Sequence, residues 1–315
     1  MRLFAAIVIA MEGEATIRAF DGSLSDAKGL LAVEGATFNE SPYTAEQVRA
    51  MLSVGDQRAW LAIGEGQVVG FVVAFPTHGL RGVCWEIDLL AVHPDWTRRG
   101  LATRLIRTAA GYGASIAGQA RAVVSTENAG SGRAFQRAGF RRAGRCELLI
   151  FRTEDGLPRP WHALGMTIHQ THGVDDVAGC VQRLGPSFEL ADLSELQEQQ
   201  NWTLLVAEAG DEIAGCAELS EVQTLLYHGV WIESLAATRS AVRVALAHGA
   251  LEYGVDAGLD EIGMMVPAAE HSLRVALQET GFRSLGTFDW FETELPMAAQ
   301  PLRDDRRERM GGDGV

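Results

Sequence analysis

A turn suited to binding an anion lies at residues 92–102, which read Val-His-Pro-Asp-Trp-Thr-Arg-Arg-Gly-Leu-Ala. It follows an apolar strand pattern and precedes an amphipathic helix, where free N–H groups and the helix dipole converge on one point. Gly100 and Ala102 let the backbone approach phosphate oxygens closely, and arginine side chains pair well with phosphate. We therefore predict a diphosphate site. Its expected residues are Thr97, Arg98, Arg99, Gly100, Leu101, Ala102 and Thr103.

Two carboxylates, Glu86 and Asp88, precede this turn on the strand expected at 83–92. Strand alternation predicts two faces, one with Glu86, Asp88, Leu90 and Val92 and the other with Trp85, Ile87, Leu89 and Ala91. Carboxylates on one partly buried face raise each other's proton affinity. A carboxylate with raised proton affinity could act as a general base. The alternative is a pair of surface carboxylates on a half-exposed sheet.

These segments resemble the GNAT superfamily of N-acetyltransferases. The family's turn, roughly Val-x-Pro-x-x-Arg/Gln-x-x-Gly-x-Gly/Ala, is matched by Val92, Pro94, Gly100 and Ala102, with Thr97 at the Arg/Gln position. A later family motif, Asn-x-x-Ala-x-x-x-Tyr-x-x-x-Gly-Phe, is matched by Asn128, Gly139 and Phe140, with Phe135 at the Tyr position.

The resemblance implies acetyl-CoA as the acyl donor and direct attack of an amine on the thioester. In histone-acetylating members a glutamate six residues before the Val of the turn is the base, which here is Glu86. The resemblance also implies that the strand splays from its neighbour, so that the backbone at Leu90, Ala91 and Val92 holds pantetheine and the thioester oxygen.

Other candidate residues, inside and outside these motifs, leave alternatives open. Asn128 could bond the pantetheine arm or cap the helix that follows. Phe135, also expected beside the cofactor, cannot donate a proton, so no general acid is assigned. Glu40 and Tyr43 lie where relatives place the acceptor and are candidates for holding a cationic amine, the alternative being an ordinary polar loop.

Charge is distributed unevenly along the 315 residues. Residues 1–155 carry 17 Lys and Arg against 16 Asp and Glu, whereas residues 156–297 carry 6 against 21. The first half suits a polyanionic cofactor, and the second should repel nucleic acid and attract cations. The apolar stretch Leu3 to Met11 is too short to span a bilayer.

Cysteines and histidines indicate no further chemistry. Four scattered cysteines without a Cys-x-x-Cys pair are typical of reduced thiols in the cytoplasm. His162, His169 and His172 have no acidic ligand at useful spacing, so we expect no metal. We expect a cytoplasmic monomer or homodimer that acts on a small-molecule amine and has no nucleic-acid or membrane partner.

The chain contains a diverged internal repeat. Four pairs of segments match in order at offsets between 142 and 151, namely 16–18 with 167–169, 67–70 with 212–215, 90–92 with 235–237, and 138–140 with 280–282. At an offset of 145, Arg239 replaces Pro94 and Ala245 replaces Gly100. We therefore predict that the second copy has lost its phosphate turn and binds no coenzyme A.

The expected fold class is α/β (α+β), with two tandem GNAT-like domains, each a mixed, mostly antiparallel sheet flanked by helices. We place a catalytic acetyl-CoA-binding domain at 1–155, a degenerate copy at 156–297 and a disordered tail at 298–315, with a linker around Pro158 and Pro160. In the first copy, strands are expected at 15–20, 59–64, 67–76, 83–92, 120–125 and 145–152, and helices near 23–38, 44–52, 100–116 and 130–138.

Three functions remain open at this stage. The first is acetyl transfer from acetyl-CoA to a primary amine of a small cationic metabolite or antibiotic. The second is the same chemistry on a peptide or protein amine. The third is a non-catalytic acyl-CoA-binding regulatory module, which the substitutions at Phe135 and Thr97 and the eroded second copy would suit.

Overall fold

The computed structural model describes residues 14–38, 41–53, 55–158, 165–171, 201–210, 212–237 and 239–296, with residues 180, 196 and 199. Several expectations lie outside these residues: those on Glu40, Pro160, His162 and His172, on the segment Leu3 to Met11, and on the tail at 298–315.

The N-terminal half, residues 14–158, contains the elements predicted for the first copy. Its strands are β1 (Thr16–Ala19), β2 (Arg58–Gly64), β3 (Gln67–Gly79), β4 (Gly82–Val92), β5 (Gln119–Ser125) and β6 (Arg141–Arg152). Its helices are α1 (Leu24–Phe38), α2 (Ala45–Ser53), α3 (Leu101–Gly113) and α4 (Ala129–Ala138), with 3-10 turns at Pro94–Trp96 and Thr153–Asp155.

Local chemistry explains how these elements begin and turn. At the start of α2 the Thr44 hydroxyl accepts from the Gln47 amide at 3.3 Å, and the Gln47 side chain accepts from the Thr44 amide at 2.8 Å. This reciprocal capping satisfies two otherwise free donors. Glu65 and Gly66 both have positive φ, as a tight two-residue hairpin requires, and they join β2 to β3.

The C-terminal half, in the described residues between 165 and 296, repeats the order of these strands and of α3 and α4. Its strands are β7 (Met166–Thr171), β8 (Trp202–Ala209), β9 (Glu212–Gln223), β10 (His228–Ala237), β11 (Glu261–Pro267) and β12 (Arg283–Glu294), and its helices include α7 (Ser240–Asp256) and α8 (His271–Glu279). No helix of the described residues is both long and apolar enough to cross a membrane.

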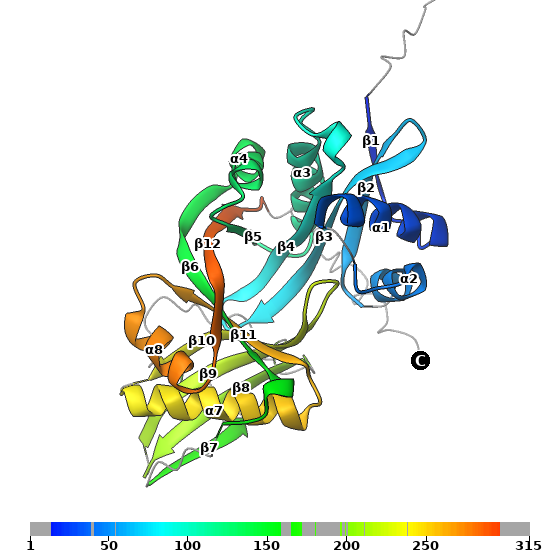
Figure 1. Ribbon diagram of the computed structural model, residues 1–315. Coiled ribbons are helices and arrows are strands. Elements are labelled where there is room, and N and C mark those ends of the chain that lie inside the picture. Colours follow the sequence, from blue (N-terminus) through cyan, green and yellow to red (C-terminus); the bar gives the residue numbers. More distant parts are fainter. Residues whose placement is uncertain are drawn as a thin grey trace, which may run out of the picture.

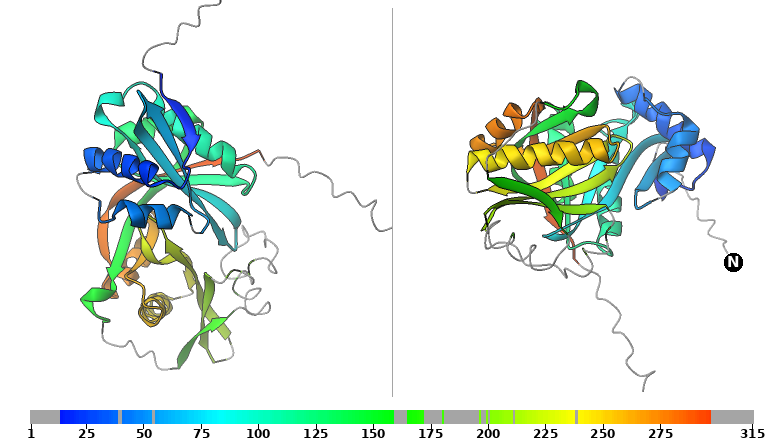
Figure 2. Two further views of the ribbon diagram at one scale, coloured as in Figure 1. Left: turned by 90° about the vertical axis from the view of Figure 1, so that its right-hand side faces the viewer. Right: turned by 90° about the horizontal axis from the view of Figure 1, so that it is seen from below.

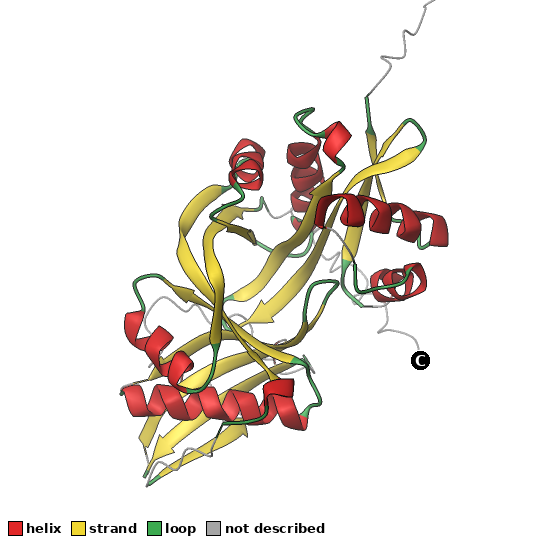
Figure 3. Ribbon diagram, in the orientation of Figure 1, coloured by secondary structure: helices red, strands yellow, loops and turns green. Residues whose placement is uncertain are grey.

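The two halves share one twelve-stranded sheet in the order β1-β2-β3-β4-β5-β12-β6-β11-β10-β9-β8-β7. The predicted class, a mostly antiparallel mixed sheet flanked by helices, is confirmed. The sequence did not predict that the last strand of each half pairs with a strand of the other half. β12 pairs with β5, and β6 pairs with β11, so both cross the junction side by side (Figure 1). The strands therefore continue from one half into the other (Figure 3).

The hairpin tips of the two halves are exchanged as well. Leu80, between β3 and β4, is 1% exposed among apolar side chains of the C-terminal half, including Trp202 and Leu204. Leu225, between β9 and β10, is 3% exposed in the cluster beneath α1 and α2. These helices lie at one end of the molecule, and α7 and α8 lie at the other (Figure 2). The halves are thus joined by buried contacts at both hairpins.

Candidate functional site

The predicted anion turn connects β4 to α3. Arg98 and Gly100 both adopt positive φ, 61° and 79°, and Gly100 is the N-cap of α3 without any side-chain cap. The first amides of α3 therefore have no partner inside the helix and converge at its positive end. Trp96 holds the turn in place, because its ring packs directly against Gly64. A Cβ atom added to Gly64 would lie only 2.4 Å from the nearest ring carbon of Trp96.

Side chains of the turn divide into those that build it and those that are free. The Thr97 hydroxyl donates to the Pro94 carbonyl at 2.9 Å, so it is used inside the turn. The Arg99 guanidinium donates to the Asp95 carbonyl and lies over the Trp96 ring at 4.5 Å. Arg98 belongs to the exposed outer part of the turn. The backbone amides and Arg98 are therefore the groups best placed to meet an anion.

A gap opens between β4 and β5 beside this turn. Their parallel pairing covers Cys84, Trp85 and Glu86 and ends there. Leu90, Ala91 and Val92 therefore lie on a strand segment that has separated from β5, the arrangement that the resemblance implied. Backbone N–H and C=O groups that have no hydrogen-bond partner on a neighbouring strand need another partner, and an extended ligand can supply it. The assignment of these residues to pantetheine stays a prediction.

The strict alternation predicted for residues 83–92 is wrong beyond Ile87, because a β-bulge lies at Asp88. Ala74 pairs with Ile87 and Val73 with Leu89, so Asp88 has no partner on β3. After the bulge, Leu89 and Ala91 pack beneath α1 and α2, whereas Trp85 and Ile87 pack on the side of α3. A bulge re-aims the side chain that it carries, and here that side chain is a carboxylate.

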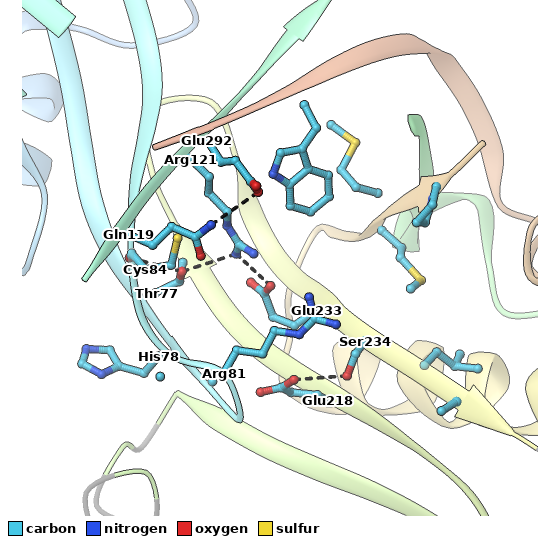
Figure 4. Close-up of a pocket in the computed structure, with 18 of the residues that line it drawn as sticks. Thr77, His78, Arg81, Cys84, Gln119, Arg121, Glu218, Glu233, Ser234 and Glu292 are labelled. Carbon is cyan, nitrogen blue, oxygen red and sulfur yellow. Dashed lines mark hydrogen bonds and ion pairs between the residues drawn. The ribbon is translucent and has the colours of Figure 1, made fainter. Parts of the chain in front are cut away.

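Glu86 is held in an ion-pair network. Its carboxylate accepts from the Arg121 guanidinium and from the Thr77 hydroxyl, the latter at 2.7 Å. Arg121 also pairs with Glu233 of β10 at 2.8 Å (Figure 4). Burial raises the pKa of Glu86, and the charge of Arg121 opposes this rise. Arg121 was not predicted, although an arginine on an otherwise apolar strand was a usable signal.

Asp88 has a different environment. One of its oxygens, Oδ2, is buried without a hydrogen-bond partner among the described residues. Burial raises the pKa of Asp88 to about 6, a hydrogen bond with Thr224 opposes the rise, and the negative charge of Glu86 adds to it. Thr224 belongs to the hairpin of the C-terminal half, so both halves form this site. A carboxylate with such a pKa is an effective general base near neutral pH.

Three hollows surround these residues. The N-terminal cleft, about 420 Å3, lies at the gap between β4 and β5 and is lined by residues that include Tyr43, Asp88, Leu90, Asn128 and Phe135. The central cavity, about 310 Å3, lies between the halves and is lined by residues that include Glu86, Asp88, Arg121, Trp231 and Glu233. The C-terminal pocket, about 890 Å3, lies at the corresponding gap of the second half (Figure 4). Asp88 lines the first two hollows.

The remaining predicted residues take less specific positions. Asn128 caps α4, since its Oδ1 accepts from the Ser131 amide at 3.0 Å, while it also lines the N-terminal cleft. Phe135 is 3% exposed and stacks on Phe291 of β12 with ring centroids 5.7 Å apart. Of the two acceptor candidates, Tyr43 lines the N-terminal cleft.

The C-terminal half repeats the gap and the bulge, with a shorter interval between the strand and the helix that follows. β10 pairs with β11 through Gly229, Val230 and Trp231 alone, and the bulge of β10 falls at Glu233. β10 ends at Ala237 and α7 begins at Ser240, whereas β4 ends at Val92 and α3 begins at Leu101. The constant offset that aligned Ala245 with Gly100 is therefore wrong here, because α7 already begins at Ser240. The interval between strand and helix is therefore shorter in the second half than in the first.

Comparisons with known proteins agree with this geometry. Residues 29–140 match the model of the acetyltransferase (GNAT) family. The chain therefore contains a GNAT acetyltransferase domain over these residues, a fold that supports acetyl transfer. A search of curated proteins found no match to the sequence.

Solved structures extend the likeness over both halves. A GCN5-related N-acetyltransferase from Sphaerobacter thermophilus is 18% identical with a TM-score of 0.59, and the match covers 89% of this chain and 96% of that one. A tandem GNAT protein from the clavulanic acid biosynthesis pathway is 16% identical with a TM-score of 0.54, and the match covers 90% and 99%. At these identities the likeness concerns the fold.

Proposed function

We propose that the protein is an acetyl-CoA-dependent N-acetyltransferase whose donor binds in the N-terminal cleft and whose amine acceptor binds in the central cavity. The observation that carries this proposal is the position of Asp88, which lines both hollows and has a buried oxygen without a partner. The turn from Arg98 to Thr103 would hold the diphosphate, and β4 would align the thioester along its unpaired segment.

In this mechanism Asp88, rather than Glu86, removes the proton from the ammonium group. Glu86 is a poorer base because its carboxylate is paired with Arg121 and Thr77. The freed nitrogen attacks the thioester carbonyl, the C–S bond breaks, and the sulfur leaves as thiolate, while the nitrogen, now part of the amide, releases its second proton to water. The proton held by Asp88 is then available to the sulfur, so the cycle needs no separate acid on α4 where Phe135 stands.

We assign the C-terminal half a supporting role. It supplies Thr224 to Asp88 and Glu233 to Arg121, and it closes the central cavity. The short interval between the end of β10 at Ala237 and the start of α7 at Ser240 supports the proposal that coenzyme A binds once per chain, in the other half. Calorimetric titration of the whole chain with coenzyme A should therefore give a stoichiometry of about one.

The test of the function is thiol release from acetyl-CoA with a panel of primary amines, with mass spectrometry of the products. We expect Asp88→Asn to abolish most of the release while coenzyme A affinity is retained. Glu86→Gln is the matched control, because it removes a neighbouring carboxylate of the same cavity that is not the base in this mechanism. Binding of coenzyme A without transfer to any amine would favour the non-catalytic module instead.

A further inference from the structure

The central cavity has an apolar lining that water would reach. Val123, Leu226 and Leu285 all line it, and they are 41%, 54% and 56% exposed. Aromatic rings from both halves complete the lining, including Phe75, Trp231, Phe288 and Trp290. Large apolar side chains left exposed around one concave space are typical of a site that buries an apolar ligand.

Two acidic side chains at equivalent bulges line this cavity, and we call them its two poles, because Asp88 also lines the N-terminal cleft and Glu233 also lines the C-terminal pocket. Asp88 and Glu233 occupy the bulges of β4 and β10, and both line the cavity. Each has one buried oxygen, Oδ2 and Oε1 respectively, without a hydrogen-bond partner among the described residues. Buried carboxylate oxygens without donors are costly, and a ligand that carries a donor at each end would satisfy both.

The two poles differ in the charge that they accept. No ion pair involving Asp88 occurs among the described residues, so this pole suits an ammonium group. Glu233 already pairs with Arg121 at 2.8 Å, and the Arg121 guanidinium also lies over the Trp290 ring at 5.5 Å. A second cation beside Arg121 would meet a like charge, so the Glu233 pole suits a neutral hydroxyl or amide donor.

We propose, building on the function proposed above, that the acceptor is a primary amine carried on an aromatic or cyclic apolar body with a neutral donor at its opposite end. The amine faces Asp88, the body fills the cavity and the donor meets Glu233. A volume of about 310 Å3 fits one such body, since ligand pockets begin at about 300 Å3. Polyamines and highly charged antibiotics are excluded, because the apolar lining cannot solvate their further charges.

Four probe amines test this ligand class: 4-hydroxyphenethylamine, phenethylamine, 1,6-diaminohexane and ethanolamine. Binding to the coenzyme A-loaded protein is measured by calorimetry, and kcat/KM is measured by thiol release from acetyl-CoA. We expect 4-hydroxyphenethylamine to exceed phenethylamine by about tenfold, and phenethylamine to exceed the two polar amines by about tenfold, in both measurements.

Substitutions locate the effect in the cavity. Leu285→Arg places a charge in the lining and should weaken binding of the aromatic amines by about tenfold or more. Leu157→Arg is its matched control, because Leu157 is a 44% exposed leucine that lines none of the three hollows. Glu233→Met should remove the advantage of the hydroxylated amine, and it leaves Glu86 and Arg121 as a balanced pair.

The possible results separate this inference from the proposed function. If the aromatic amines bind in the expected order but no acetyl group is transferred, the ligand class stands and the proposed function is wrong. If a polar amine is acetylated as well as the aromatic ones, the function stands and the ligand class is overturned. Equal effects of Leu285→Arg and Leu157→Arg on binding would also overturn the ligand class.

Discussion

Asp88→Asn should make the protein more stable at neutral pH. Burial raises the pKa of Asp88 to about 6, against about 3.9 in an unfolded chain. Folding therefore favours the protonated form, whose contribution to stability is fully present below about pH 4 and is lost as the pH rises through about 6. A shift of two units corresponds to at most about 3 kcal/mol. Because the side chain is partly exposed, we expect asparagine to recover about 1 kcal/mol at pH 7.

The same substitution should remove most of the activity. A carboxyl group of pKa 6 is about one-tenth ionised at pH 5 and about nine-tenths ionised at pH 7, so kcat/KM of the unmodified protein should rise about tenfold over that interval. Asp88→Asn should lower kcat/KM by about 10²- to 10⁴-fold and abolish this rise. A residue that only supported the fold would lose stability and activity together.

The assay combines urea unfolding at pH 5 and pH 7 with thiol release over the same range. Glu86→Gln serves as the comparison. This variant keeps Asp88, so its kcat/KM should still rise with an ionisation at or below about pH 6, although the ion pairs of Arg121 are weakened. The reasoning would be refuted if Asp88→Asn were less stable than the unmodified protein at pH 7. It would fail equally if the variant kept the rise in kcat/KM between pH 5 and pH 7.

Three further results are expected. Leu225→Ala should lower the free energy of unfolding by about 2–4 kcal/mol in urea titrations, because Leu225 is 3% exposed, whereas Leu226→Ala, at a 54% exposed position, should change it by under about 0.5 kcal/mol. Gly100→Ala and Gly139→Ala should each lower the free energy of unfolding by about 1 kcal/mol, because both glycines have positive φ and free space for a Cβ. Calorimetry should show loss of coenzyme A affinity for Gly100→Ala alone. Arg121→Met should cost about 3–5 kcal/mol at pH 8, and less at pH 5, because burial raises the pKa of the Glu86 carboxylate that it leaves behind and protonation removes that buried charge; an equal cost at both values would contradict this.

Local patterns in the sequence predicted most elements of the N-terminal half. The strand expected at 83–92 is β4 at Gly82–Val92, and the helix expected at 130–138 is α4 at Ala129–Ala138. Hydrophobic periodicity and capping residues act over a few positions, so they can be read without knowledge of the fold. The turn before Gly100 was predictable for the same reason.

The remaining features depend on contacts between distant residues. A bulge at Asp88 is a register shift against β3, which the composition of β4 does not encode. The pairing of Arg121 with Glu86 and Glu233 joins three strands, and the last of them lies in the other half. Whether Glu86 or Asp88 is free to act as a base therefore could not be decided from their spacing.

The exchange of β6 and β12 has a consequence for the order of synthesis. β5 ends at Ser125 and its partner β12 begins at Arg283, so about 160 residues are translated between them. At about 5–20 residues per second this takes about 8–30 s, during which β5 emerges from the ribosome with an unpaired edge. Completion of the N-terminal half therefore waits for a strand made much later, and a nascent chain must be kept from pairing that edge with another copy in the meantime.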